Sequence, residues 1–218
     1  LNTSWNIYNF RLNLVRALFE QGHEVVAVAP KDEYTPKLID LGCQYEEVKM
    51  DSRGANPIKD MALTFELFKI YKRVKPDAIL HYTIKPNIYG TIAASRLKIP
   101  VINNVCGLGT AFLKQNLISK IALALYKFAF RFPELIYFQN TDDKNFFVDS
   151  KIVKENKIDI LPGSGIDLDR FVPSPVETKP HKPFTFLLIS RLIHDKGIVE
   201  YIEAIKLLRA KGVKARFE

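Results

Sequence analysis

The sequence predicts an α/β protein built on doubly wound parallel sheets, and two observations lead to this prediction. Short runs rich in β-branched residues alternate with segments of helical periodicity along residues 7–161. This alternation is typical of parallel sheets with crossover helices. A proline-rich stretch, residues 172–183, then precedes a second start of the same pattern, so it is expected to link two lobes.

The helices and strands of the first lobe follow one another in a regular order. A helix over residues 7–21 precedes a strand over 24–29, and a helix over 33–41 precedes a weaker strand over 43–50. Pro57 suits the first turn of a helix that runs to about Val74. Its inner face is expected to hold Ile58, Met61, Phe65, Phe68 and the region of Tyr71. The remaining predicted strands cover 78–82, 101–105, 135–138 and 158–161, and the remaining helices cover 87–97, 116–132 and 141–148.

The second lobe begins with residues 184–190, which are apolar enough to predict a fully buried strand. An amphipathic helix over 198–210 and a strand from 213 onward follow. Residues 1–4 resemble the end of a strand and the loop after it, and residues 213–218 begin a strand that stops. We therefore expect a piece of a longer protein, with the first strand missing and the second lobe truncated.

Composition excludes several classes of protein. The 218 residues are 47% hydrophobic and 26% charged, which excludes collagen-like, low-complexity and largely disordered chains. Two cysteines, Cys43 and Cys106, are too few for a disulfide framework or a cysteine-based zinc site, so a reducing, cytoplasmic location is expected. The sequence shows neither a basic-then-apolar leader nor an apolar run of about 18 residues.

The positive charge is concentrated in two places. The net charge is 32 − 24 = +8, of which residues 179–218 contribute +5 and residues 114–131 contribute +4. Two local excesses suggest two separate anionic contacts. The basic residues are not interleaved with aromatics on one continuous surface, so nucleic acid is not an expected partner.

The clearest candidate site is the segment that joins the strand over 184–190 to the next helix. Arg191 follows the strand, and Lys196 and Gly197 stand where the helix opens, beside free backbone N–H groups that attract anions. In open α/β sheets the ligand crevice lies at this edge. Two cations here fit a diphosphate, although a solvated loop with incidental charge would look similar.

Three motifs together resemble one known family. They are Ser190-Arg191-Leu192 with Lys196-Gly197, the stretch from Leu161 to Asp167, and Phe171-Val172-Pro173. This combination is similar to the retaining family-4 glycosyltransferases of GT-B fold, which have two Rossmann-like domains. The stretches at 5–11, 32–38, 107–109 and 138–143 are similar to a bacterial subgroup of N-acetylgalactosaminyl- and galactosyltransferases, which act on polyprenyl-diphosphate-linked saccharides of O-antigen or capsule type.

The resemblance implies how the two lobes divide the reaction. Residues 1–171 would form the acceptor-binding domain, and residues 184–218 would begin the domain that binds a nucleotide sugar, in this subgroup UDP-linked. Arg191 and Lys196 match the pair that holds the donor diphosphate and stabilises the leaving group, so no metal is required. The family's Glu-x7-Glu motif is absent from this sequence, and the chain alone is therefore expected to be inactive.

Further residues are candidates by the same resemblance. His81 ends a strand where the family places a histidine near the reaction centre, although a lone histidine there is often structural. Lys85 is expected either to contact an acceptor phosphate or to cap its loop. Arg11 is a candidate contact of the acceptor diphosphate, with a surface ion pair as the alternative.

Glycines mark two loops at the predicted edge. Gly107 and Gly109 would let the acceptor approach closely, or simply form a flexible turn. Gly163 and Gly165 would line the donor cleft, or serve as turn glycines ahead of the linker. The nearby Asp167-Leu168-Asp169 imitates a metal motif of a different glycosyltransferase fold, and its place beside a linker argues against metal binding.

The helix over 116–132 predicts a membrane contact. At 100° per residue Lys120, Lys127 and Arg131 fall within about 40° of one another, and apolar residues cover most of the remaining circumference. A narrow basic stripe of this kind suits an anionic bilayer surface. The alternative is a core helix with one wet edge. The membrane interpretation places the enzyme on the inner face of the cell membrane, which carries its acceptor.

Two other functions remain open at this stage. A sugar-nucleotide epimerase of similar two-domain fold would need paired acids in the cleft and no membrane-facing helix. A nucleotide-binding module without enzymatic activity is the third possibility.

Overall fold

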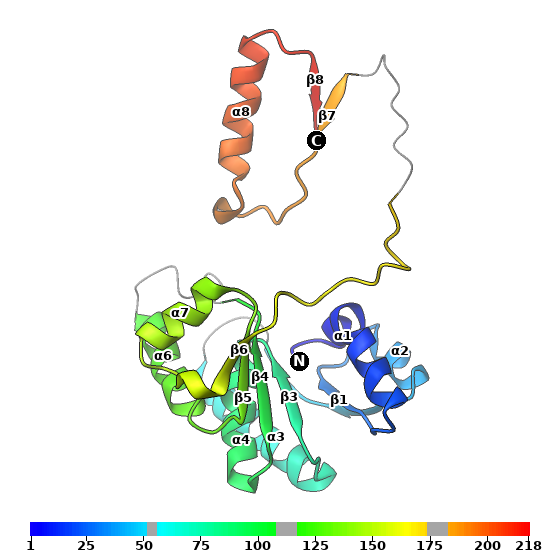
Figure 1. Ribbon diagram of the computed structural model, residues 1–218, viewed down its shortest axis with the longest axis vertical. Coiled ribbons are helices and arrows are strands. Elements are labelled where there is room, and N and C mark those ends of the chain that lie inside the picture. The colour runs from blue at the N-terminus through cyan, green and yellow to red at the C-terminus, as the bar shows by residue number, and fades with distance from the viewer. Residues whose placement is uncertain (52–55, 108–116, 174–182) are drawn as a thin grey trace. The chain divides into compact units, whose positions relative to one another are not determined.

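The computed structural model describes residues 1–51, 56–107, 117–173 and 183–218, and it divides into two units, Leu1–Phe171 and Val172–Glu218 (Figure 1). The first unit contains, in chain order, α1 (Ser4–Glu20), β1 (Val26–Ala29), α2 (Thr35–Asp40), β2 (Gln44–Glu47), α3 (Pro57–Val74), β3 (Ile79–Tyr82), the π-helical turn η1 (Pro86–Gly90), α4 (Thr91–Leu97), β4 (Val101–Val105), α6 (Leu117–Ala129), β5 (Leu135–Phe138), α7 (Thr141–Asp149), η2 (Glu155–Lys157) and β6 (Ile158–Ile160).

All strand pairs of the first unit are parallel. β1 pairs with β2, and a second sheet has the order β3-β4-β5-β6. Its register places His81 of β3 beside Asn103 of β4. The predicted α/β class with parallel sheets is thus confirmed, and most element boundaries differ from the predicted ones by only a few residues.

A cavity of about 730 Å³ lies between the two sheets of the first unit. Ala27 of β1, Leu80 of β3 and Leu14 of α1 are among the residues that line it. The Leu1 nitrogen donates a hydrogen bond to the Val28 carbonyl oxygen across 3.2 Å. Among the described residues no strand pairs with the facing edges of β1 and β3.

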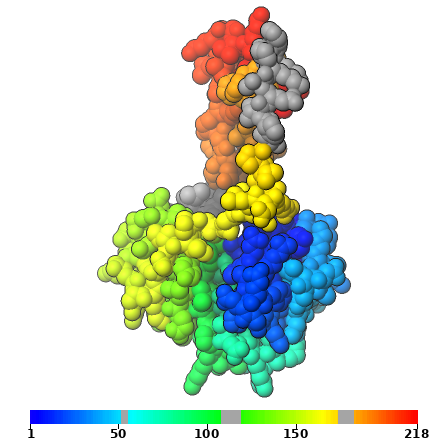
Figure 2. Space-filling model, turned by 45° about the vertical axis from the view of Figure 1, so that its right-hand side comes forward, coloured from blue at the N-terminus to red at the C-terminus, as the bar shows by residue number. Residues whose placement is uncertain are grey.

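Three apolar clusters hold the unit together. Aromatic side chains of α6, β5 and α7 form one of them, in which the Tyr126 and Phe147 ring centroids lie 5.2 Å apart. Leu63 and Leu67 of α3 pack with α4 and β4 in the second. The third joins α1 and α2 to β1, and the two helices lie side by side on the surface of this unit, in dark and lighter blue in Figure 2.

The buried face of α3 differs from the predicted one. Ile58, Met61 and Phe65 are 75%, 70% and 59% exposed, so the expectation that they face inward is wrong. It is confirmed for Tyr71, which is buried, and for Phe68, which is partly buried against the same cluster. The buried residues of this helix are Asp60, Leu63, Leu67, Ile70 and Tyr71. Both sets have helical spacing, and the buried one includes a carboxylate, whose partner is Lys85 on another element. Periodicity alone therefore selected the more apolar stripe instead of the buried one.

The second unit contains β7 (Phe184–Phe186), η3 (His194–Lys196), α8 (Ile198–Ala210) and β8 (Ala215–Phe217), and β7 pairs with β8 in parallel. The predicted buried strand over 184–190 is wrong in length and burial. The strand spans three residues, all exposed, and no described residue of this unit is buried. One neighbouring strand and one helix are too little structure to cover both faces of a strand.

Candidate functional site

The candidate site of the first unit lies where β3 and β4 end. Parallel strands present their carboxyl ends at one edge of the sheet, which is where α/β proteins bind ligands. Tyr82 ends β3, and Cys106 follows β4 directly. Arg11 reaches this edge from α1, Thr83 follows β3 directly, and Lys85 has helical backbone at the N-cap of η1.

His81 lies in a buried polar network below this edge. Its side chain is 3% exposed, and Nε2 lies 2.9 Å from the Tyr71 hydroxyl. Nδ1 lies 3.1 Å from the Asn103 side-chain oxygen, and the Thr91 hydroxyl lies 3.2 Å from the same oxygen. Both ring nitrogens are therefore engaged, since each can take part in one hydrogen bond in the neutral ring.

Burial is the main cause of an altered pKa at His81. Desolvation lowers the pKa of the ring to about 3, against a smaller opposing effect of the Asn103 hydrogen bond. The ring is neutral at physiological pH. Contact with a substrate would require one of its hydrogen bonds to break, so the catalytic role expected from the sequence stays a prediction that this geometry does not favour.

Arg11 forms a different contact from the surface ion pair considered as an alternative. The carbon at the centre of its guanidinium group lies 4.1 Å from the centroid of the Tyr82 ring, a cation–π geometry. Nη2 donates to the Cys106 sulfur at 3.5 Å, and burial raises the pKa of this thiol. Nε is buried and has no hydrogen-bond partner among the described residues. The side chain is thus held at the site edge, where contacts with the described residues engage two of its five N–H donors.

Thr83 has an unusual backbone. Its φ is +67°, a conformation that is costly for a β-branched residue and is concentrated at functional sites. The Thr83 hydroxyl is buried and has no partner among the described residues. A small cavity of about 150 Å³ adjoins this loop, and Asn2, Met50, Thr83, Ile84 and Lys85 line it.

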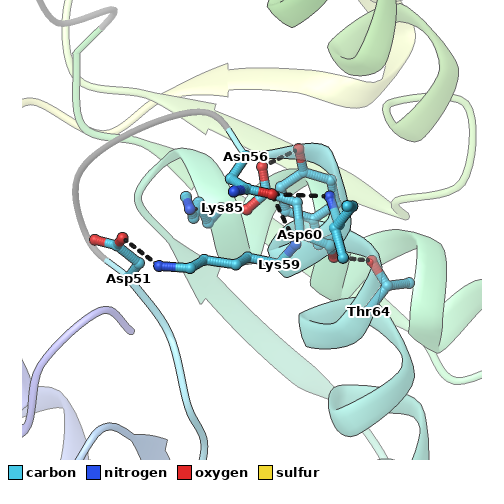
Figure 3. Close-up of polar contacts among 8 residues, drawn as sticks. Asp51, Asn56, Lys59, Asp60, Thr64 and Lys85 are labelled. Carbon is cyan, nitrogen blue, oxygen red and sulfur yellow. Dashed lines mark hydrogen bonds and ion pairs between the residues drawn. The ribbon is translucent and has the colours of Figure 1, made fainter.

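Lys85 is held by a buried ion pair, which Figure 3 shows. Its Nζ lies 2.8 Å from Oδ1 of Asp60, and the two side chains are 14% and 7% exposed. The Tyr89 hydroxyl donates to Oδ2 of Asp60 at 3.0 Å. Burial and the neighbouring carboxylate both raise the pKa of Tyr89, which keeps this hydroxyl protonated.

The predicted glycines lie in turns of the first unit. Gly107 has φ +124°, and Gly163 and Gly165 have φ +77° and +69°, conformations that glycine adopts without strain. Apart from the chain neighbours, no atom of the described residues lies within 4 Å of the position that a Cβ would take at any of the three. The backbone is therefore open at these points. Gly109 lies outside the described residues.

Helix α6 presents a mixed basic and apolar face. Lys120 and Lys127 are exposed on α6, and Arg131 is exposed in the turn that follows, since the helix ends at Ala129 and not at residue 132 as predicted. Ile121, Phe128 and Phe132 are also exposed, and the Phe128 and Phe132 rings are in edge-to-face contact. Tyr126, Ala129 and Phe130 are buried on the other side. Across the described ranges, no helix combines the length and the apolar character needed to cross a bilayer.

The second unit carries the predicted donor cations on one connection. Arg191 and Lys196 are both exposed between β7 and α8. The Ile193 amide donates to the Arg191 carbonyl at 2.8 Å, and the Lys196 amide donates to the Ile193 carbonyl at 3.1 Å, so the loop is held by its own backbone. Gly197 follows with φ +73° and leads into α8.

The Asp167-Leu168-Asp169 sequence forms a local turn. Oδ1 of Asp167 accepts hydrogen bonds from the amides of Asp169 and Arg170, both at 3.1 Å. This carboxylate therefore caps its own turn, which gives the motif a structural explanation.

Comparison with known proteins places the chain in a family. A sequence model of the glycosyl transferase 4-like family matches residues 2–140, which is more than half of the chain. This chain belongs to the glycosyl transferase 4-like family. The resemblance inferred from its motifs is thereby confirmed.

Two curated relatives of this glycosyl transferase 4-like chain illustrate the similarity. The N,N'-diacetylbacillosaminyl-diphospho-undecaprenol alpha-1,3-N-acetylgalactosaminyltransferase of Campylobacter jejuni is 32% identical over 95% of this chain and 59% of its own length. The UDP-Gal:alpha-D-GlcNAc-diphosphoundecaprenol alpha-1,3-galactosyltransferase of Escherichia coli is 26% identical over 72% of this chain and 42% of its own. The chain thus spans about half the length of these relatives.

Solved structures confirm the fold. Anabaena Alr3699/HepE, in complex with UDP and glucose, has a TM-score of 0.61 at 16% identity, over 84% of this chain and 50% of that one. A UDP-GlcNAc 2-epimerase from Neisseria meningitidis has a TM-score of 0.55 at 17% identity, over 90% of this chain and 58% of that one. The glycosyl transferase 4-like chain therefore has the expected GT-B type of α/β fold, and these likenesses do not separate transferase from epimerase.

Sequence reasoning missed several residues at the site of this glycosyl transferase 4-like chain. Asp60 is a carboxylate in phase with the buried residues of α3, which is a signal that the sequence does contain. Asn103 and Asn104 interrupt an otherwise apolar strand, a second readable signal. The left-handed backbone of Thr83 has no signal in the sequence, because threonine disfavours that conformation.

Proposed function

We propose that this chain is part of a retaining glycosyltransferase of bacterial glycan biosynthesis. The enzyme moves a hexose or N-acetylhexosamine from a UDP-linked sugar to a polyprenyl-diphosphate-linked saccharide. The observation that carries the proposal is the 32% identity to the Campylobacter jejuni transferase over 95% of the chain. The Escherichia coli relative, whose name also specifies a diphosphoundecaprenol-linked acceptor, supports the same class of substrate.

The donor diphosphate is assigned to the second unit. Arg191 and Lys196 are exposed on one short loop, and Lys196 directly precedes the glycine that leads into α8. Negative charge develops on the leaving diphosphate as the glycosidic bond breaks, and two fixed cations stabilise that charge. No metal is required for this role. Gly163 and Gly165 are proposed to leave room for the donor.

The acceptor is assigned to the first unit, where Arg11, Lys85, Gly107 and Gly109 are the proposed contacts. Arg11 retains a buried Nε donor without a partner among the described residues, and Lys85 borders the 150 Å³ cavity beside Thr83. Both cations belong to elements that meet the carboxyl edge of β3. These two cations would bind the diphosphate of the acceptor at this edge through charge-assisted hydrogen bonds to its phosphate oxygens.

Peripheral membrane contact is assigned to α6. The helix exposes Lys120, Lys127, Ile121 and Phe128, and the turn after it exposes Arg131 and Phe132, so cations can approach anionic headgroups while apolar side chains enter the interface. A polyprenyl-linked acceptor resides in a membrane, and the cytoplasmic leaflet supplies negative charge. The proposed location is therefore the inner face of the cell membrane.

The test is an assay of an intact protein that carries this chain, supplied with a panel of nucleotide sugars and polyprenyl-diphosphate-linked acceptors. We expect mass spectrometry to show an acceptor heavier by one sugar residue, with one nucleoside diphosphate released per transfer. Conversion of the nucleotide sugar to its epimer without acceptor would instead establish the epimerase. Binding of the nucleotide without any reaction in the full panel would support a module without enzymatic activity.

A further inference from the structure

The Lys85 ammonium group lies in an environment that fixes its position. Its side chain is 14% exposed, and Oδ1 of Asp60 lies 2.8 Å from Nζ. A carboxylate and an ammonium group placed this far from water require each other, because an unpaired buried charge is costly. If Asp60 were neutral, Lys85 would gain by turning toward solvent and leaving this place.

Asp60 is itself fixed from several directions. It lies in the first turn of α3, where the positive end of the helix dipole favours a carboxylate. The Tyr89 hydroxyl donates to Oδ2 at 3.0 Å and so holds the second oxygen. Asn56 caps the same turn by accepting from the amides of Ile58 and Lys59, as Figure 3 shows. The carboxylate therefore has a defined orientation before any ligand binds.

Lys85 adjoins a feature that a structural ion pair would not need. It borders the 150 Å³ cavity together with Thr83, whose backbone is strained and whose buried hydroxyl has no partner among the described residues. The ammonium group has three donors, and Asp60 takes one of them. The others can serve a ligand at the edge where β3 ends.

We propose that Asp60 and Tyr89 are positioning residues, which hold the Lys85 ammonium group for the diphosphate of the lipid-linked acceptor. This inference rests on the proposed function, because it takes the acceptor from it. Asp60 acts through Lys85 and does not itself touch the acceptor. The negative charge of Asp60 disfavours a diphosphate, but Lys85 screens that charge. In Asp60→Asn the loss of the ordered ammonium group therefore weakens diphosphate binding more than the removal of the carboxylate strengthens it.

The test measures binding, so that it does not depend on turnover. Farnesyl diphosphate, a short polyprenyl diphosphate, is titrated calorimetrically into an intact protein that carries this chain, and UDP is titrated in a parallel series. The variants are Asp60→Asn, Lys85→Gln and the double variant. Lys59→Gln is the matched control, since Lys59 lies in the same turn of α3 and forms an exposed ion pair with Asp51 at 3.6 Å.

We expect Asp60→Asn and Lys85→Gln each to weaken farnesyl diphosphate binding about tenfold, a loss of about 1.4 kcal/mol. In the Lys85→Gln background Asp60→Asn should weaken farnesyl diphosphate binding by less than about a further twofold, because the ammonium group that Asp60 positions is already absent. UDP affinity should stay within about twofold in every variant, and Lys59→Gln should match the wild type.

Several results would overturn the proposal. One is that Asp60→Asn binds farnesyl diphosphate as tightly as the wild type or more tightly, and another is that the effects of the two substitutions multiply in the double variant. A third is that the variants lose UDP binding while they keep farnesyl diphosphate binding, and a fourth is that the wild type binds no farnesyl diphosphate. Each of these four results contradicts the proposal. If Asp60→Asn fails to fold, Tyr89→Phe replaces it, with an expected loss of about threefold that disappears in the Lys85→Gln background. Sugar transfer by the wild type, measured separately, shows whether the proposed function itself holds.

Discussion

At the scale of single residues, His81 and Gly90 are fitted closely to each other. The His81 ring lies against the backbone of Gly90 at the end of η1, and a Cβ at position 90 would stand 2.5 Å from Nε2. The ring cannot move away without losing its bonds to Tyr71 and Asn103. Glycine is therefore required here by the space available, whereas its φ is unremarkable.

Gly90→Ala should lower the free energy of unfolding by about 1–3 kcal/mol, the usual cost of overpacking a buried site. Urea denaturation measures this difference. In a His81→Ala background the clash is absent, and alanine is favoured over glycine in a helix, so the same substitution should cost little or even stabilise. An equal loss in both backgrounds would show that the His81 ring is not the cause.

The buried His81 ring also predicts how stability depends on pH. Its pKa is about 3 in the folded protein, against 6.5 for an ordinary histidine. Below pH 6.5 the His81 ring is protonated in the unfolded chain, whereas in the folded chain it becomes protonated only near pH 3. The contribution of His81 to the free energy of unfolding is therefore fully present above pH 6.5. As the pH falls from 6.5 to 3, the free energy of unfolding decreases by at most about 1.4 kcal/mol per pH unit.

Urea denaturation at pH 7 and pH 5 checks this dependence. Between the two values the wild type should lose roughly 2 kcal/mol more than His81→Gln, which has no titrating ring. Equal losses in the two proteins would mean that the ring is accessible to protons in the folded state. That result would reopen the acid–base role expected from the sequence.

At the scale of elements, the order of helices and strands was predictable and several faces were not. The strand over 135–138 and the parallel pairing follow from local patterns, which the tertiary structure does not override. The face of α3 was mispredicted because Asp60 is buried with a partner 25 positions along the chain. The strand over 184–190 was mispredicted because apolar composition indicates a preference for burial, whereas burial needs neighbouring structure.

Helix α6 gives the prediction that belongs to this scale. Lys120→Glu, Lys127→Glu and Arg131→Glu together should reduce binding to anionic liposomes by more than tenfold, since each cation near such a surface contributes about 1 kcal/mol. Co-sedimentation measures the binding. Reversal of three exposed cations elsewhere, Arg16, Lys31 and Lys49, is the control with the same change in net charge. Equal effects of the two triple variants would contradict a role specific to α6.

At the scale of the whole molecule, the candidate site could be predicted only in part. Arg191, Lys196 and Lys85 were located from motifs at strand ends, because parallel sheets present those ends at one edge. The Asp60 and Tyr89 partners of Lys85 come from other parts of the chain, and only the folded unit brings them together. We propose that the first unit binds the acceptor and that the second unit holds the leaving nucleotide.

The most direct test of this division is the steady-state kinetics of Arg191→Gln/Lys196→Gln in an intact protein that carries this chain. Both side chains are exposed, so the fold should not change, and Arg209→Gln serves as an exposed control in the same unit. We predict a donor KM at least tenfold higher and a kcat at least a hundredfold lower, with the acceptor KM unchanged. Nucleotide affinity and turnover equal to those of the wild type would contradict the account.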